Sequence, residues 1–147
     1  MKASKILFPT DFSSYGQEAL RWATALARDT GATLIIAHVE EPPMAYGGGE
    51  MYFPSEEGDR EELRRALVKI VPTDPSVTFE HKLLVGDPAM AIVDAAEQEN
   101  ADLIVIGTHG RTGLTRLLMG SVAENVVRKA KCPVLTVKHP SAVPAGG

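Results

Sequence analysis

The residues with the clearest potential for chemistry are glycines in the last third of the chain. Gly107, Gly110 and Gly113 recur at short intervals, and Gly120 directly precedes Ser121 where a helix is expected to begin. Backbone amides without neighbouring side chains, next to a helix N-terminus, form a site suited to phosphate. This spacing therefore predicts that the stretch holds the phosphates of a nucleotide.

Two better-known phosphate-binding motifs do not fit this stretch. The P-loop requires a lysine after its last glycine, and no lysine follows a glycine between residues 107 and 121. The dinucleotide fingerprint requires glycines in the first strand-to-helix turn, where Pro9–Ser14 stand instead. Gly47–Gly49 has no helix immediately behind it and is interpreted as flexibility. The remaining pattern is G-x2-G-x9-G-[ST], formed by Gly107, Gly110, Gly120 and Ser121.

The elements that must position these glycines alternate between strand and helix. Apolar runs predict strands at Lys5–Pro9, Thr33–Val39, Val77–Val85, Leu103–Ile106 and Pro133–Val137. Helical spacing predicts helices from Tyr15 to about Arg28, from Gly58 or Asp59 to Val71, from Pro88 onward, and from Ser121 to about Ala130. This alternation predicts an α/β fold with a parallel sheet, right-handed crossovers and helices on both faces.

Local signals predict several boundaries and the placement of two strands. Ser13 or Ser14 is the expected N-cap of the first helix, and Gly31 its C-cap. Asp87 is expected to cap the third helix, with Pro88 at the first helical position. The nearly continuous apolar run at 33–39 predicts an interior strand, and the looser alternation at 77–85 an edge strand. Residues 40–57 are compatible with a mobile surface loop or with a lid over a ligand.

Composition sets limits on the class of protein. The chain has 147 residues, a net charge of −4 and 44% hydrophobic residues, which predicts one globular domain. The Pro, Ala and Gly content of residues 139–147 predicts a flexible tail after a domain at 1–138. The lack of a basic surplus argues against general nucleic-acid binding. No apolar run is long enough for a membrane span, and no signal peptide is recognisable. The single cysteine, Cys132, is interpreted as a small buried residue, which fits a reducing cytoplasm.

Five segments, in order along the chain, resemble the universal stress protein family, specifically its ATP-binding branch. They are Ile6–Ser13, Gly86–Pro88, Ala101–Gly113, Gly120–Arg128 and Cys132–Val137, and the resemblance covers essentially residues 3–138. It implies a Rossmann-like, open five-stranded parallel sheet with the order 3-2-1-4-5. Strands one and four would then lie at the topological switch point, where such sheets bind ligands. The loops Pro9–Asp11 and Gly107–Gly113 would converge there.

The resemblance also implies a site for the nucleoside. Asp11 would accept hydrogen bonds from the ribose hydroxyls, although a role in capping the first helix remains an alternative. Val39 would meet the adenine edge through its backbone, with Pro9 and Thr10 lining the base and sugar.

For the phosphates, Gly107 and Gly110 would allow the loop backbone to approach closely. Gly120, Ser121 and Val122 would supply amides at the start of the last helix, with the Ser121 hydroxyl as a further donor. The expected ligand is ATP.

Thr108, His109 and Arg111 complete the expected nucleotide site, where Arg111 either reaches phosphate or is solvated. Mg²⁺ or Mn²⁺ would be held mainly by the phosphates and water, because Mg²⁺ seldom requires a full protein cage. No general base is evident beside the predicted phosphates, and no catalytic residue is assigned. The expected function is nucleotide-dependent regulation or stress protection. A slow adenine-nucleotide hydrolase, or an interaction module that does not depend on nucleotide, are the alternatives.

The last predicted strand raises the question of assembly. Pro133–Val137 would be an edge strand without a charge inside it, and such an edge invites pairing with another chain. The family resemblance implies a homodimer joined through this strand, which an isologous antiparallel contact would satisfy. Coverage of the edge by the tail at 139–147 is the alternative.

Overall fold

The computed structural model describes residues 3–42, 56–108 and 119–138, with side chains in the second helix described from Arg60 onward. In chain order the elements are β1 (Lys5–Pro9), η1 (Ser14–Gly16), α1 (Gln17–Thr30), β2 (Thr33–Glu40), α2 (Glu56–Val68), β3 (Phe79–Val85), α3 (Pro88–Gln98), β4 (Leu103–Gly107), α4 (Ser121–Lys129) and β5 (Val134–Val137). The strands form one parallel sheet with the order β3-β2-β1-β4-β5, which confirms the predicted fold.

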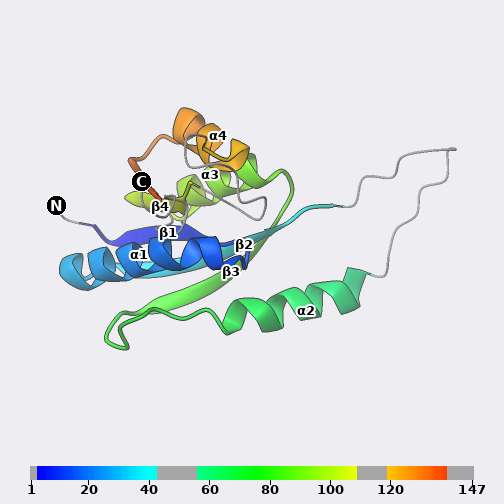
Figure 1. Cartoon of the computed structure of the whole chain (residues 1–147), viewed down its shortest axis with the longest axis horizontal. Helices are drawn as coiled ribbons and strands as arrows, with labels where there is room; N and C mark the ends of the chain where they lie inside the picture. The colour runs from blue at the N-terminus through cyan, green and yellow to red at the C-terminus, as the bar shows by residue number, and fades with distance from the viewer. Residues whose placement is uncertain (1–2, 43–55, 109–118, 139–147) are drawn as a thin grey trace, which may run out of the picture.

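Helices cover both faces of this sheet, and the interior strands β1, β2 and β4 are largely apolar on both sides for that reason. Figure 1 shows α3 and α4 on one side of the strands and α1 and α2 on the other. Successive strand residues point to opposite faces. On β1, Ile6 and Phe8 therefore join the core under α1, whereas Leu7 joins the core under α3 and α4. The same division separates Ile36 from Ile35 on β2.

The start of the first helix differs from the prediction. A short 3-10 turn occupies Ser14–Gly16, and α1 begins at Gln17 with Gly16 as its N-cap. Neither predicted serine caps α1: the Ser13 hydroxyl donates to the Asp11 carboxylate at 2.6 Å, and Ser14 is the first residue of η1. The end of the helix was predicted correctly, since Gly31 is its C-cap with a left-handed φ of 77°.

Several other boundaries also differ, and two of these differences have a local cause. Helix α2 ends at Val68 and not at Val71, and the chain then turns toward Pro72, whose ring disfavours helical backbone in the preceding residue. Strand β3 begins at Phe79, because the Val77 amide is used in a turn to the Asp74 carbonyl. Its edge position is confirmed by the sheet order. Among the described residues, no helix combines the length and apolarity required to cross a bilayer.

Candidate functional site

The predicted site lies at the carboxyl edge of the sheet, beside two adjacent strands. Strand β1 pairs with β2 on one side and with β4 on the other. The first three strands of the chain are therefore added toward one edge of the sheet and the last two toward the opposite edge, so the direction of the strand order reverses between β1 and β4. Pro9 is the last residue of β1 and Gly107 the last of β4. In open parallel sheets the crevice at such a reversal is where ligands bind. Pro9 and Gly107 therefore end adjacent parallel strands at one edge of the sheet, whereas the rest of the predicted glycine loop, from His109, lies outside the described residues.

The segment after β1 is held against β2 by Thr10. Its amide donates to the carbonyl of Ala37 at 2.8 Å, which extends the β1–β2 ladder by one bond. The Thr10 carbonyl lies 2.7 Å from Nδ1 of His38, and the Thr10 hydroxyl oxygen accepts from the Phe12 amide at 3.1 Å. Both backbone groups and the side chain of Thr10 thus take part in fixing this turn.

Asp11 shapes the next step of the same turn. Its Oδ1 accepts hydrogen bonds from the amide of Ser13 at 2.9 Å and from the Ser13 hydroxyl at 2.6 Å. Asp11 therefore closes an Asx turn that leads into η1, and does not cap α1 itself. A carboxylate offers about four acceptor positions, so these contacts are compatible with additional donors.

The side chains of Phe12 and His38 stack beside this turn. Phe12 has a φ of 66°, and its ring lies 4.1 Å from the His38 ring, centroid to centroid, with an interplanar angle of 31°. A left-handed backbone costs a residue with a Cβ about 1–2 kcal/mol. The aromatic contact and the Thr10–His38 hydrogen bond each contribute about 0.5–1.5 kcal/mol, so together they are large enough to offset this strain.

After β4, Thr108 connects the strand to the last helix. Its amide donates to the Val137 carbonyl at 2.9 Å, and its carbonyl accepts from the Gly120 amide at 2.7 Å. Thr108 is buried, with 6% of its surface exposed. These contacts attach the start of α4 to the end of β4.

The first turn of α4 presents backbone amides at this edge. Gly120 is the N-cap, with φ −60° and ψ 151°, and Ser121 and Val122 are the first two helical residues. The first amides of a helix have no partner within the helix. Because glycine has no side chain to cap them, the amides of Ser121 and Val122 are suited to an anion.

The remaining predicted residues are only partly placed. Val39 lies near the end of β2, packed against the core under α3 and α4. His109, Gly110 and Arg111 lie outside the described residues, as do Gly113, most of the proposed lid at 40–57 and the tail at 139–147. Within the described ranges no cluster of histidine, cysteine or acidic side chains could hold a metal ion.

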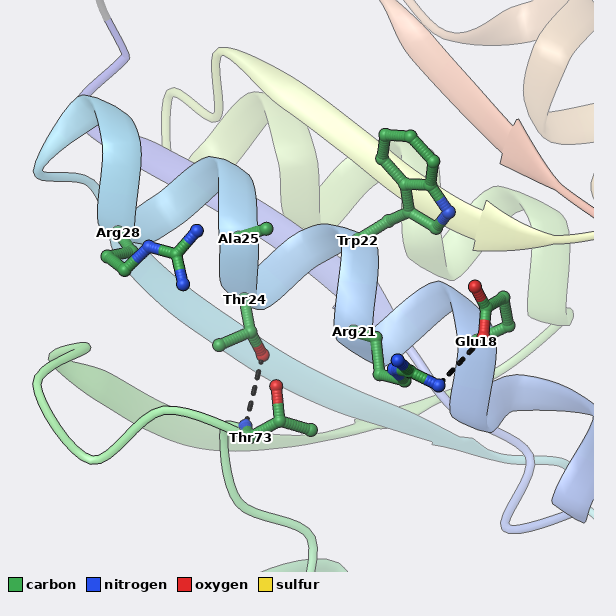
Figure 2. Close-up of a pocket in the computed structure, with 7 residues that line it drawn as sticks. All are labelled: Glu18, Arg21, Trp22, Thr24, Ala25, Arg28 and Thr73. Carbon is green, nitrogen blue, oxygen red and sulfur yellow. Dashed lines mark hydrogen bonds and ion pairs between the residues drawn. The ribbon is translucent and has the colours of Figure 1, made fainter.

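A hollow of about 350 Å³ lies elsewhere, on the outer side of α1 (Figure 2). Its polar lining is already paired: Arg21 meets Glu18 at 3.5 Å, and the Thr73 amide donates to the Thr24 hydroxyl at 3.2 Å. No residue of the predicted nucleotide site lines it. The hollow is therefore separate from the predicted nucleotide site.

Comparison with known proteins agrees with this architecture. The model of the universal stress protein family matches residues 2–138. The chain belongs to this family. Universal stress protein MJ0531 of Methanocaldococcus jannaschii is 41% identical over 145 residues, which cover 92% of this chain and 82% of that protein. Universal stress protein MJ0577 of the same organism is 33% identical, with 92% of this chain and 94% of that protein covered.

Solved universal stress proteins share the fold. UspA of Lactobacillus plantarum has a TM-score of 0.73 and 26% identity, over 93% of this chain and 99% of its own. A universal stress protein in complex with cAMP has a TM-score of 0.63 and 30% identity, over 95% and 99%. The protein from Archaeoglobus fulgidus in complex with dAMP has a TM-score of 0.62 and 30% identity, over 94% and 100%. Adenine nucleotides are thus ligands of two similar proteins.

The sequence interpretation missed two residues of this edge, Phe12 and His38. His38 could have been found from the sequence, because it lies inside an otherwise apolar strand and a buried polar side chain requires a hydrogen-bond partner. The left-handed backbone of Phe12 had no comparable signal in the sequence.

Proposed function

We propose that this chain binds an adenine nucleotide, ATP, in the crevice between the turn after β1 and the start of α4. One observation carries the proposal. The Thr10–Ser13 turn and the N-terminus of α4, whose cap Gly120 has no side chain, both lie at the carboxyl edge, beyond the adjacent strands β1 and β4. Together they offer a carboxylate for a sugar and amides for phosphates.

The proposed roles follow from the chemistry at each end of the crevice. Asp11 accepts hydrogen bonds from the ribose hydroxyls, and Pro9 and Thr10 line the base and sugar. The backbone of Val39 meets the adenine edge. These groups lie at or just beyond the carboxyl ends of the neighbouring strands β1 and β2, as a nucleoside lying across them requires.

The phosphates lie toward α4 in this proposal. The amides of Ser121 and Val122 donate to them, as does the Ser121 hydroxyl, and Gly107–Arg111 approach from the other side. The field at a helix end favours an anion by only about 0.3–1 kcal/mol, so directed hydrogen bonds supply most of the affinity. Mg²⁺ or Mn²⁺ accompanies the nucleotide, held mainly by phosphate and water.

The proposed role is nucleotide-dependent regulation or protection under stress, in a cytoplasmic homodimer joined through β5. The cAMP and dAMP complexes of similar proteins support the class of ligand. We favour a regulator over a catalyst because the phosphate side offers a single histidine, His109, with no carboxylate close to it in the sequence to pair with.

The first test is to denature the purified protein and identify any nucleotide released. Calorimetric titration with ATP and Mg²⁺ follows, and we expect a Kd below about 100 μM, near −5.5 kcal/mol. Asp11→Ala should weaken ATP binding, and the matched control Asp94→Ala, on the exposed side of α3, should leave it unchanged. No affinity for adenine nucleotides at high micromolar concentration would refute the proposal.

The hydrolase alternative is tested with the same preparation. Turnover of ATP faster than about one per second, dependent on Mg²⁺, falls within the ordinary enzyme range and would favour a catalyst. We expect turnover far below this rate.

A further inference from the structure

We infer that His38 is a positioning residue for the nucleotide, acting through the turn that carries Asp11. It does so by two contacts that reach the turn from β2: a hydrogen bond to the Thr10 carbonyl and a ring contact with Phe12. The inference rests on the proposed nucleotide site, which it deepens by naming what sets the geometry of its ribose end.

The strand places the His38 ring on the side of the sheet that faces α1. Alternation along β2 puts His38 on the same face as Leu34 and Ile36, which belong to the core under that helix. His38 is 7% exposed, and Phe12 packs against the same core. A polar ring in this position needs a partner, and Thr10 supplies it.

The contact with Thr10 fixes the tautomer of the ring. A carbonyl oxygen only accepts hydrogen bonds, so Nδ1 of His38 must carry the hydrogen and donate it across 2.7 Å. The Thr10 amide is bonded to Ala37 at the same time, so both peptide groups that flank Thr10 are tied to β2.

The contact with Phe12 fixes the residue between the two ends of the Asx turn. Asp11 precedes Phe12 and Ser13 follows it, and Asp11 and Ser13 are joined through the carboxylate. The left-handed φ of Phe12 is what allows the chain to close this turn while its ring returns to His38. His38 therefore holds the residues on either side of Asp11, and thereby the direction of its carboxylate.

His81 offers a matched control elsewhere in the sheet. Its Nε2 lies 2.7 Å from the Ile70 carbonyl, and its ring meets Phe79 edge-on with centroids 5.4 Å apart. It repeats the chemistry of His38, a ring bonded to a backbone carbonyl and touching an aromatic ring, but it lies on β3, away from the turn.

The test measures ATP binding by calorimetry for three variants, at a temperature where each is folded. His38→Leu should raise the Kd about tenfold, and His81→Leu should leave it within about twofold of the parent protein. His38→Asn, whose amide nitrogen can replace the Nδ1 donor, should recover part of the loss. Equal effects of the two leucine variants would overturn the inference and leave the proposed function intact.

A double-mutant cycle separates positioning from general stabilisation. If His38 acts through Asp11, His38→Leu should change the Kd less than about twofold in an Asp11→Ala background. Full additivity of the two changes would overturn the inference. If the parent protein binds no ATP, the proposed function fails, and the role of His38 in it fails too.

A measurement on the unmodified protein completes the test without relying on a variant. The ¹⁵N spectrum of the His38 imidazole at neutral pH should show the hydrogen on Nδ1. A hydrogen found on Nε2 alone would remove the bond to Thr10 and refute the inference, whatever the binding results.

Discussion

The backbone amide of Gly120 donates a 2.7 Å hydrogen bond to the carbonyl oxygen of Thr108. This bond joins the cap of α4 to the first residue after β4. The amide of Thr108 is in turn bonded to Val137, the last residue of β5. One residue therefore links two strand ends to a helix N-terminus, and the amides of that helix come to lie at the edge of the sheet where the nucleotide is proposed to bind.

Gly120→Asp should make the protein more stable and bind ATP less well. The backbone of Gly120 is extended, so an aspartate fits there without strain and can cap the first amides of α4. Capping and the helix dipole together should add a few tenths to about 1 kcal/mol, or up to about 4 °C in Tm. The same carboxylate occupies the phosphate-binding amides and repels phosphate, so the ATP Kd should rise at least about tenfold.

Thermal unfolding of Gly120→Asp checks the gain in stability, and calorimetry checks the loss of ATP affinity. Gly120→Asn is the uncharged control. A more stable variant with unchanged ATP affinity would show that the phosphates lie away from α4.

Thr136→Pro should separate the proposed dimer without unfolding the protomer. The carbonyls of Pro133 and Val137 accept from β4, so the alternation of a parallel ladder turns the Thr136 amide toward the open edge. Proline removes an amide needed only by a second chain, and edge strands tolerate it. Light scattering should report a monomer, and circular dichroism an unchanged fold.

Thr136→Val is the control for the edge strand, because it keeps the amide and should keep the dimer. A proline variant that still runs as a dimer would place the interface elsewhere on the protein.

Asp102→Asn should reduce the loss of stability on acidification. The amides of Ser4 and Lys5 donate to the Asp102 carboxylate at 2.7 and 3.1 Å and hold its pKa below the ordinary value for aspartate. In the unfolded chain an aspartate carboxyl group has a pKa near 3.9. A lowered pKa in the folded state contributes stability that is present above about pH 4 and is lost as the pH falls through the folded value.

The variant lacks this contribution, so it should be less stable at pH 7 and lose less stability below about pH 4. Urea unfolding from pH 6 to pH 2 should give two curves that converge in acid. Asp94→Asn, on the exposed side of α3, is the matched control, and parallel curves for Asp102→Asn and the parent would contradict the prediction.

Asp87→Ala should destabilise the fold by about 1 kcal/mol through the loss of a helix cap. The Asp87 carboxylate accepts from the Met90 amide at 3.1 Å, in the first turn of α3. Denaturant unfolding should show the loss as a lower midpoint with an unchanged slope. Asp87→Ser retains a capping oxygen and should stay within a few tenths of a kcal/mol of the parent, whereas equal losses in both variants would argue against capping.

Features that depend on neighbouring residues were predictable from the sequence. Asp87 before Pro88 predicted the start of α3, and Gly31 predicted the end of α1, because helix termini depend on a few adjacent backbone groups. The apolar run of β2 predicted an interior strand, since only a strand covered on both faces can bury every residue. The sheet order came from the resemblance to the family and is confirmed.

Features that depend on distant contacts were decided by the tertiary structure. Ser13 satisfied the pattern of an N-cap, yet Asp11 takes its hydroxyl, because the turn is bent by contacts from β2. Phe12 adopts a left-handed backbone that its residue type disfavours, and the ring that stabilises it belongs to His38 on another strand. The sequence by itself thus determined the elements, through local propensities and hydrophobic periodicity, and the nucleotide site that its glycine spacing predicts stays a prediction. The shape of the turn that presents Asp11 was set only when β1 and β2 paired, since the energies that offset its strain come from across the sheet.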